Sequence, residues 1–204
     1  MKDAGKSSYK PQKVNSTHTW VGRMDVVVAS KYFLLLLATS FIGWAWEVLL
    51  ELTLSQKFVN RGFMTMPFCP IYGCSLFAVY FLLGTPSEGR GILKNVQSKA
   101  LRVVLYASFA FLIPTAAEFL VGWFFHRFFS LRLWSYQGFP YNVQGYICLP
   151  VSILWAVAVI LFMEWVFPFL KKWIFRNPNR LAVWLAVFFV IAVAVDMTAS
   201  FTRV

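Results

Sequence analysis

The sequence has little charge for its length and very few acidic residues. Charged residues make up 13% of its 204 residues, and only 8 residues are Asp or Glu, whereas a soluble domain usually carries about 25% charged residues. Hydrophobic residues make up 59% of the chain and include 22 Phe and 9 Trp. The shortage of charge excludes an ordinary soluble domain and predicts an all-α, polytopic membrane protein folded as one helix bundle.

Cysteine and histidine are also scarce. The chain has three cysteines, Cys69, Cys74 and Cys148, and two histidines, His18 and His126. No CxxC pair and no Cys/His ligand spacing occurs, so we expect no disulfide scaffold, no metal site and no cofactor. Cys69 and Cys148 both open segments that start on the outer side. A disulfide between them is the less favoured alternative to two buried thiols.

The net charge of +11 would favour nucleic-acid binding in a soluble protein. Here the Lys and Arg residues fall between apolar runs and not on one amphipathic face. Such a distribution is typical of membrane proteins, whose cytoplasmic loops carry the excess of basic residues. We therefore expect no nucleic-acid partner.

Five segments are predicted to cross the membrane, because a spanning helix needs about 20 mostly apolar residues. With a cytoplasmic N-terminus, 14 of the 19 Lys and Arg residues fall on inner segments, which predicts an N-in, C-out orientation. The second span is short and interrupted, so a re-entrant segment is the alternative there. We expect a disordered basic tail over residues 1–31 and a transmembrane domain over residues 32–204. The predicted spans are 32–54, 68–83, 101–125, 146–170 and 181–201.

Acidic residues inside these spans are the strongest functional signal. A charge at the centre of a membrane helix costs about 2.5–3.5 kcal/mol, so it usually faces a protein interior or a wet cavity. Glu47 and Glu118 both lie about 22–26 Å along their helices at 1.5 Å per residue. We predict a paired acidic site in an outward-facing cavity; the alternative is that each carboxyl only locks helices together. The other three intramembrane acids, expected to be interfacial or structural, are Glu51, Glu164 and Asp196.

A second signal is the stretch NRGFMTMPFCPIYG at 60–73. Pro67, Pro70 and Gly73 are predicted to prevent a regular helix through the outer leaflet. Irregular backbone at membrane depth is tolerated only where it is buried in protein or lines a cavity. The alternative is a kinked helix that packs through small residues. The candidate substrate-binding residues of this stretch are Asn60, Arg61 and Tyr72.

A third signal is the stretch RLWSYQGFPYNVQGYICLP at 132–150, which is predicted to lie on the same side. Its candidate binding residues are Trp134, Tyr136 and Asn142, although its aromatic residues also suit an interfacial belt. Pro114 precedes Glu118 by four residues and is expected to bend the third span and widen the cavity.

The motifs GWAWE at 43–47, NRGF at 60–63, PFCPIYG at 67–73, AAEF at 116–119 and the 132–150 stretch occur in this order. In these motifs the chain resembles the CmpB-like family of type IV ABC-transporter permeases over roughly residues 32–170, together with related eukaryotic transmembrane proteins. The resemblance implies a multi-pass protein of the bacterial inner membrane. Ser135 replaces the family's usual acidic residue, which argues against catalysis there. The chain lacks GxxxxGK[ST], so any ATPase would be a separate subunit.

These features favour a permease-like subunit that binds a small or amphipathic solute. Glu47 and Glu118 would set the electrostatics of the cavity, Arg61 would pair with them or with an anionic group, and Asn60 and Asn142 would orient the solute. One alternative is an intramembrane enzyme that uses the two carboxyls as acid and base on lipid-linked substrates; another is a scaffolding subunit. No catalytic residue is assigned. The expected partners are membrane lipids, the solute, and a separate ATPase or a second copy of the chain.

Overall fold

The computed structural model describes residues 17–56, 58, 60 and 62–203. These residues form α-helices joined by short turns and one small hairpin, so the all-α prediction is confirmed. The elements are α1 (Thr17–Ser55), α2 (Pro70–Leu83), η1 (Gly91–Asn95), α3 (Lys99–Phe129), β1 (Asn142–Val143), β2 (Ile147–Cys148), α4 (Leu149–Leu161), η2 (Phe162–Val166), α5 (Phe167–Arg176) and α6 (Asn179–Phe201).

Four of the described helical segments are long and apolar enough to cross a membrane: Val26–Thr53, Lys99–Phe129, Leu149–Arg176 and Asn179–Phe201. They match four of the five predicted spans. Helix α2 has 14 residues and is therefore only about 21 Å long. A fifth crossing through α2 and the N-in orientation stay predictions.

Helix α1 begins at Thr17, whereas the sequence led us to expect a span from Tyr32 and a tail over residues 1–31. Residues 17–31 form the first turns of the helix, and residues 1–16 lie outside the described part of the chain. The helix continues through the expected boundary because no proline interrupts it there and because residues 26–28 extend the apolar run.

Lys31 lies at this expected boundary and is only 6% exposed. Its ammonium donates hydrogen bonds to the Phe175 carbonyl at 3.0 Å, to the Asn177 carbonyl at 3.1 Å and to the Asn179 side chain at 2.7 Å. Carbonyls at the end of a helix attract cations. Lys31 thus holds α1 against the turn between α5 and α6.

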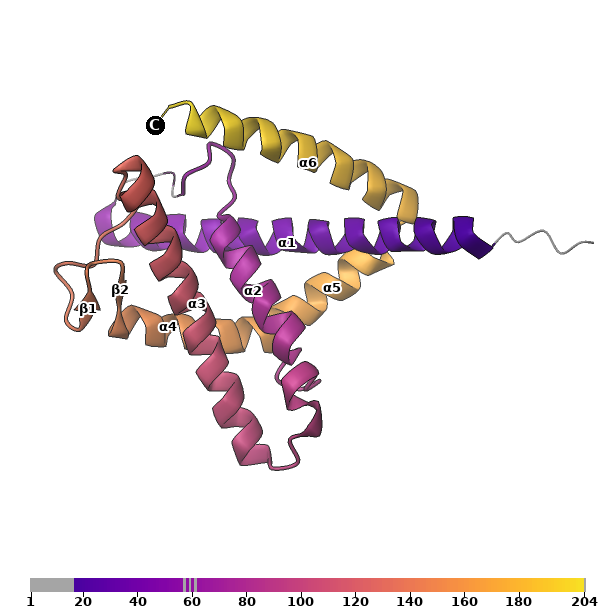
Figure 1. Ribbon diagram of the computed structural model, residues 1–204, viewed down its shortest axis with the longest axis horizontal. Coiled ribbons are helices and arrows are strands. Elements are labelled where there is room, and N and C mark those ends of the chain that lie inside the picture. Colours follow the sequence, from indigo (N-terminus) through magenta and orange to yellow (C-terminus); the bar gives the residue numbers. More distant parts are fainter. Residues whose placement is uncertain (1–16, 57, 59, 61, 204) are drawn as a thin grey trace, which may run out of the picture.

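Helix α1 is the longest element; α2, α5 and α6 pack against it, whereas α3 packs against α2 and α4 (Figure 1). Helix α2 starts at the middle of α1 and crosses it obliquely (Figure 1): the Cys69 N–H donates to the Ser40 carbonyl in the middle of α1 at 3.2 Å, and the Phe77 ring reaches Tyr32 with centroids 6.3 Å apart. Helix α3 lies beside α2 on its other side, and α6 lies along α1 (Figure 1). The chain therefore returns from the end of α1 to its middle before α2 begins.

The described residues between Ser55 and Pro70 are not helical, but the predicted second span, residues 68–83, is a regular helix from Pro70 onward. Pro70 occupies the first turn of α2, where the missing N–H costs no hydrogen bond. The prediction that Gly73 breaks the helix is wrong, because Gly73 lies inside α2. A Cβ atom at Gly73 would lie 2.8 Å from the Leu36 carbonyl oxygen, so this glycine allows α2 to approach α1 closely.

The fourth long segment contains one π-helical turn, η2, between α4 and α5. Pro168 has no N–H to donate to the carbonyl of Glu164, four residues earlier. The Phe167 N–H instead bonds the Phe162 carbonyl, five residues earlier, which is the π-helical pattern. The Glu164 carboxylate accepts hydrogen bonds from the Ser87 N–H, at 3.1 Å, and from the Ser87 hydroxyl. Glu164 thus fixes the loop after α2 and has the structural role expected for it.

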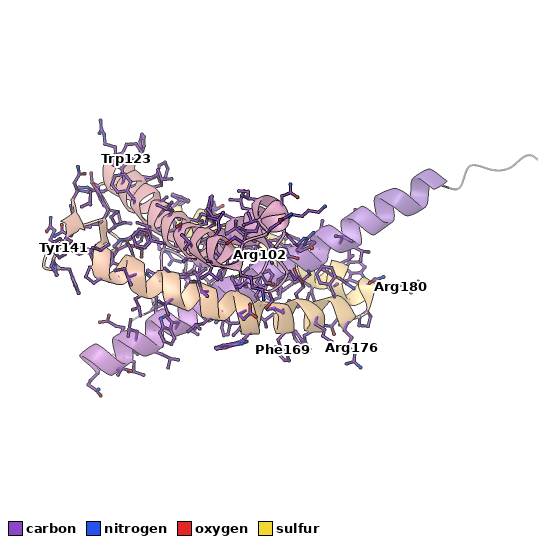
Figure 2. All side chains as sticks on the ribbon, turned by 90° about the horizontal axis from the view of Figure 1, so that it is seen from below. Arg102, Trp123, Tyr141, Phe169, Arg176 and Arg180 are labelled. Atoms are coloured by element: carbon purple, nitrogen blue, oxygen red, sulfur yellow. The ribbon has the colours of Figure 1, made fainter. Side chains whose placement is uncertain are left out.

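The two ends of the molecule differ in character. Arg176 and Arg180 lie toward the end where α1 begins, and Tyr141 lies toward the opposite end (Figure 2). Asp196 lies toward the Tyr141 end, where its carboxylate accepts a hydrogen bond from the Met66 N–H at 2.8 Å. The polar stretches at 60–69 and 132–148 therefore share one end of the bundle, as the sequence predicts.

Candidate functional site

Glu47 is positioned by a tyrosine that packs on a glycine. Gly43 leaves room on α1 for the Tyr72 ring, since a Cβ atom there would lie 2.5 Å from two ring carbons. Gly43 and Glu47 are four residues apart and so share one face of the helix. The Tyr72 hydroxyl therefore reaches Glu47 and donates to its Oε1 at 2.5 Å. The Cys69 thiol lies 3.9 Å from the other carboxylate oxygen.

Glu118 is held in a corresponding way on α3. Gly122, four residues later, faces Trp134 and Tyr146, whose ring atoms lie 3.3 and 3.2 Å from where a Cβ atom would be. The Tyr136 hydroxyl donates to Glu118 Oε1 at 3.3 Å. Glu118 is only 7% exposed. In both helices, then, a glycine one turn from the acid makes room for an aromatic side chain, and a tyrosine bonds the carboxylate.

The charges of both carboxylates affect the pKa of Tyr136, which lies in the loop before α4. Burial raises the pKa of the Tyr136 phenol well above its usual value, and the negative charges of Glu118 and Glu47 raise it further. The phenol therefore stays a hydrogen-bond donor at neutral pH. Glu47 and Glu118, which the sequence predicts to lie at similar depths, are thus close enough in the fold for both charges to affect the same phenol.

The loop that carries Tyr136 is built around the β1–β2 hairpin. Its Tyr136 N–H donates to the Gly145 carbonyl at 2.9 Å. The Asn142 side chain donates to the Phe139 carbonyl at 2.8 Å and accepts from the Gly145 N–H at 3.1 Å. The Trp134 indole donates to the Tyr146 carbonyl at 2.9 Å. Asn142 and Trp134 therefore shape the loop. Their hydrogen bonds to backbone groups hold Tyr136 in place.

Asn60 has a similar local role near the end of α1. Its side chain accepts from the Trp44 indole at 2.7 Å and donates to the Thr65 carbonyl at 3.2 Å. Arg61, the other candidate of this stretch, lies outside the described residues. The structure thus brings together Glu47, Tyr72, Glu118 and Tyr136, while Asn60 bonds a side chain and a backbone carbonyl near it.

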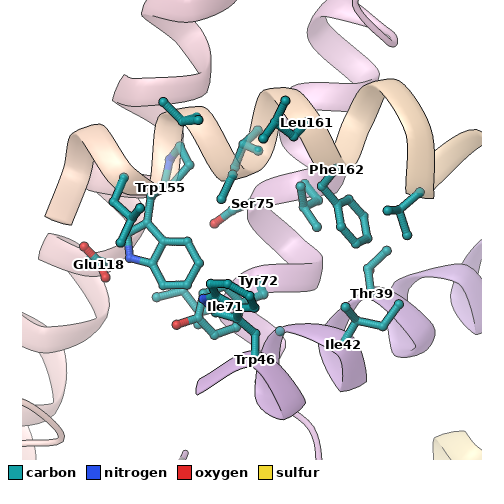
Figure 3. A pocket seen from close by; sticks show the side chains of 18 of the residues that line it. Thr39, Ile42, Trp46, Ile71, Tyr72, Ser75, Glu118, Trp155, Leu161 and Phe162 are labelled. Atoms are coloured by element: carbon teal, nitrogen blue, oxygen red, sulfur yellow. The ribbon is translucent and has the colours of Figure 1, made fainter. Parts of the chain in front are cut away.

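A cavity of about 410 Å³ adjoins these acids. Glu118 and Trp155 lie at one end of it, and Phe162 faces Ile42 and Thr39 at the other (Figure 3). Its lining is mostly apolar, so the cavity is less polar than the sequence led us to expect. The polar side chains in the lining are Thr39, Tyr72, Ser75 and Glu118, with the indole nitrogens of the tryptophans.

Two buried polar atoms beside the cavity, Glu118 Oε2 and Trp155 Nε1, make no hydrogen bond of normal geometry among the described residues, although the indole lies close enough to the carboxylate to interact with it. The Trp155 ring stacks at a tilt on Tyr72, with centroids 4.9 Å apart, and its indole lies next to Glu118 (Figure 3). Buried polar groups in proteins are nearly always hydrogen-bonded. A small movement would pair this donor with this acceptor directly, and a water molecule or the polar group of a ligand that bridges them would satisfy both as well.

The mouth of the cavity lies between α1 and the α4–η2 segment. Lining residues from both sides are exposed: Trp46 on α1 is 49% exposed, and Leu154, Val157 and Trp165 are 52%, 50% and 67% exposed. These side chains belong to segments that are apolar enough to span a membrane. In a bilayer, apolar side chains at such depth meet acyl chains. The exposed side chains at the mouth are thus of the kind that acyl chains cover in a bilayer.

Trp155 and the two glycines were not among the residues selected from the sequence. Trp155 is one of several tryptophans inside an apolar run, and only the fold places it beside Glu118. The glycines Gly43 and Gly122 each lie four residues from an acid, and this spacing was the available signal. None of the three cysteines, all of which lie in the described part of the chain, forms a disulfide, and no three His, Cys, Asp or Glu side chains cluster as metal ligands within the described ranges.

The long apolar helices and the buried carboxyls define a multi-pass membrane protein. A family model described as "Putative ABC-transporter type IV" matches residues 34–201, so the chain belongs to this family and is a transport-related membrane protein. A search of curated proteins found no match, and a search of solved structures also found none.

Proposed function

We propose that the chain is the membrane subunit of a transporter and that it binds an amphipathic solute in the cavity between α1, α2, α3 and α4. One observation carries this proposal: the buried Glu118 carboxylate, one oxygen of which makes no hydrogen bond of normal geometry, lies at one end of a mostly apolar cavity that is also lined by exposed apolar side chains of membrane-length helices. An apolar chain fits the lining. A polar head group fits the end at Glu118.

The chemistry of that end favours a head group that donates hydrogen bonds or carries positive charge. Glu118 Oε2 makes no hydrogen bond of normal geometry, and Glu47 adds a second negative charge nearby, as its effect on Tyr136 indicates. The Trp155 indole can in turn donate to an oxygen of the solute. An anionic head would meet two carboxylates and is disfavoured.

The position of the mouth supports entry from the bilayer. A molecule with a long apolar chain is already concentrated in the membrane, so it reaches the cavity between α1 and α4 without crossing a polar vestibule. Its head would then move past Trp46 and Trp165 toward Glu118. The outward-facing orientation of the Glu118 end follows from the distribution of Lys and Arg and belongs to the same proposal.

The energy source and the setting complete the proposal. Membership in an ABC-transporter family is compatible with a separate ATPase partner and with lipid contacts. We place the protein in the bacterial inner membrane, with either an ATPase subunit or a second copy of the chain beside it.

The experiment measures binding of a pyrene-labelled alkylammonium amphiphile to purified protein in phosphatidylcholine nanodiscs, with a pyrene-labelled alkyl sulfate of equal length as the comparison. We expect the ammonium to bind at least tenfold more tightly than the sulfate. Glu118→Gln should weaken ammonium binding about tenfold, because it removes the charge and leaves the volume. Glu88→Gln, an exposed acid outside the cavity, is the matched control and should bind normally.

A cavity-filling pair of variants tests the same site without changing charge. Ala158→Phe places a ring inside the cavity and should abolish binding of the ammonium, whereas Ile153→Phe, on the same helix but outside the lining, should leave binding unchanged. Monodisperse elution of every variant shows that the fold is intact. Unchanged binding in both Glu118→Gln and Ala158→Phe would refute the proposed site.

A further inference from the structure

A second polar cluster lies at the other end of α2, away from the cavity. The Tyr80 hydroxyl accepts a hydrogen bond from Arg90 Nη1 at 2.9 Å and another from Lys171 Nζ at 2.5 Å. Tyr80 itself is 2% exposed. Three separate elements, α2, the loop before η1, and α5, therefore bring one phenol and two cations together.

The two cations are unusually close to each other. Because both bond the same oxygen, their nitrogens are at most about 5.4 Å apart, the sum of the two bond lengths. Both also lie over the Tyr80 ring, with Arg90 Cζ 5.6 Å and Lys171 Nζ 5.0 Å from its centroid. Like charges at such a distance repel one another. The fold thus holds two positive charges together against their repulsion.

No carboxylate within the described part of the chain neutralises this pair. The carboxylate of Glu164, in the turn before α5, accepts hydrogen bonds from Ser87. Lys171 uses one of its three donors on Tyr80, and Arg90 uses one of five. Arg90 is exposed, so unused donors are accessible. The cluster therefore has both the charge and the free donors that an anion requires.

We propose that Arg90 and Lys171 bind the phosphate of an anionic lipid head group. The site lies at the end of a membrane bundle, and α5 continues with further basic residues, Lys172 and Arg176. Exposed apolar side chains flank the cations, with Phe81 63% and Ile92 49% exposed, and these offer a surface for the acyl chain. Arg and Lys are the side chains that bind phosphate oxygens best.

The proposal is independent of the solute cavity, because it depends on other residues at the other end of α2. Lipid binding also explains why the cluster has two cations, which the stability of the fold alone does not require. A structural link between α2 and α5 needs one cation on the Tyr80 hydroxyl, whereas the fold places two there.

Native mass spectrometry of the purified protein tests this site, with phosphatidylglycerol and phosphatidylcholine of identical acyl chains as probes. We expect the wild-type chain to bind one phosphatidylglycerol at least tenfold more tightly than phosphatidylcholine. The double variant Arg90→Gln/Lys171→Gln should lose this preference. The double variant Lys94→Gln/Lys172→Gln removes the same charge from exposed positions of η1 and α5 and should stay within twofold of wild type.

Three outcomes would overturn the proposal. Equal loss in the two double variants would show a general charge effect, and retention of the preference in Arg90→Gln/Lys171→Gln would exclude these residues. Competition by inorganic phosphate at the same concentration as the lipid would assign the site to free phosphate. If the double variant does not elute as a folded species, Arg90→Gln alone, at an exposed position, should still weaken phosphatidylglycerol binding at least threefold.

Discussion

Gly43→Ala tests directly how α1 and α2 form the site. A Cβ atom at Gly43 would lie 2.5 Å from two ring carbons of Tyr72 and 2.6 Å from its Cβ, whereas carbon atoms normally approach to about 3.5–4.0 Å. Rotation of the ring cannot relieve this overlap because the Tyr72 Cβ itself is involved. Helix α2 must therefore move away from α1 by about 1 Å.

The magnitude follows from three contributions. Overpacking of this kind costs about 1–3 kcal/mol. Loss of the Tyr72–Glu47 hydrogen bond, which involves a charged acceptor, adds up to about 1.5–3 kcal/mol. The higher helix propensity of alanine offsets about 1 kcal/mol of this cost. We expect Gly43→Ala to lower the free energy of unfolding by about 2 kcal/mol, equivalent to a fall in Tm of about 4–8 °C for a chain of this size.

The assay is thermal unfolding in detergent, followed by tryptophan fluorescence. Gly138→Ala is the matched control, since a Cβ atom there meets nothing within 4 Å, and it should change stability by less than about 0.5 kcal/mol. In a Tyr72→Gly background, which removes both the ring and the Cβ atom that overlap with the new methyl group, Gly43→Ala should be neutral or stabilising by up to about 1 kcal/mol. A similar loss in both backgrounds would refute the reasoning.

Three further predictions concern the supports of the site. Gly122→Ala should be milder than Gly43→Ala, costing less than about 1 kcal/mol, because its Cβ atom would meet ring atoms at 3.2–3.3 Å; the same unfolding assay measures this. Lys31→Met should cost about 2–3 kcal/mol, because it removes three hydrogen bonds made by a buried charged donor, whereas Lys172→Met should be nearly neutral. Tyr136 has a raised pKa in the folded state, so its contribution to stability is complete below about pH 10 and is lost as the pH rises above that value. Tyr136→Phe should therefore reduce the fall of Tm between pH 9.5 and 11. A fall equal to that of the wild type would contradict this prediction.

Much of the fold could be predicted from the sequence because membrane insertion depends on local composition. Apolar runs, and the basic residues between them, are visible without knowledge of contacts. The start of α1 was harder to predict. In the sequence, Lys31 is typical of a charge at the end of a membrane span, and only the fold brings the carbonyls of the α5–α6 turn to its ammonium group. The π turn had a local signal, Pro168 four residues after Glu164, but its effect depends on the helix continuing through it.

The acids of the site could be selected from the sequence because charge in an apolar run is rare. Depth along each helix indicated that Glu47 and Glu118 lie at similar levels, but it gave no information on which side chains bond them. Tyr72 and Tyr136 were among the candidates for binding solute, and the structure instead shows them bonded to the two carboxylates. Trp155 carries no charge and so had no signal.

The most direct test of the cavity is photo-crosslinking with an alkylammonium amphiphile that carries a diazirine in its chain. The account predicts adducts on peptides from α2 and α4, their loss in Ala158→Phe, and their retention in Ile153→Phe. Adducts spread evenly over the lipid-exposed helices, or unchanged adducts in Ala158→Phe, would contradict it.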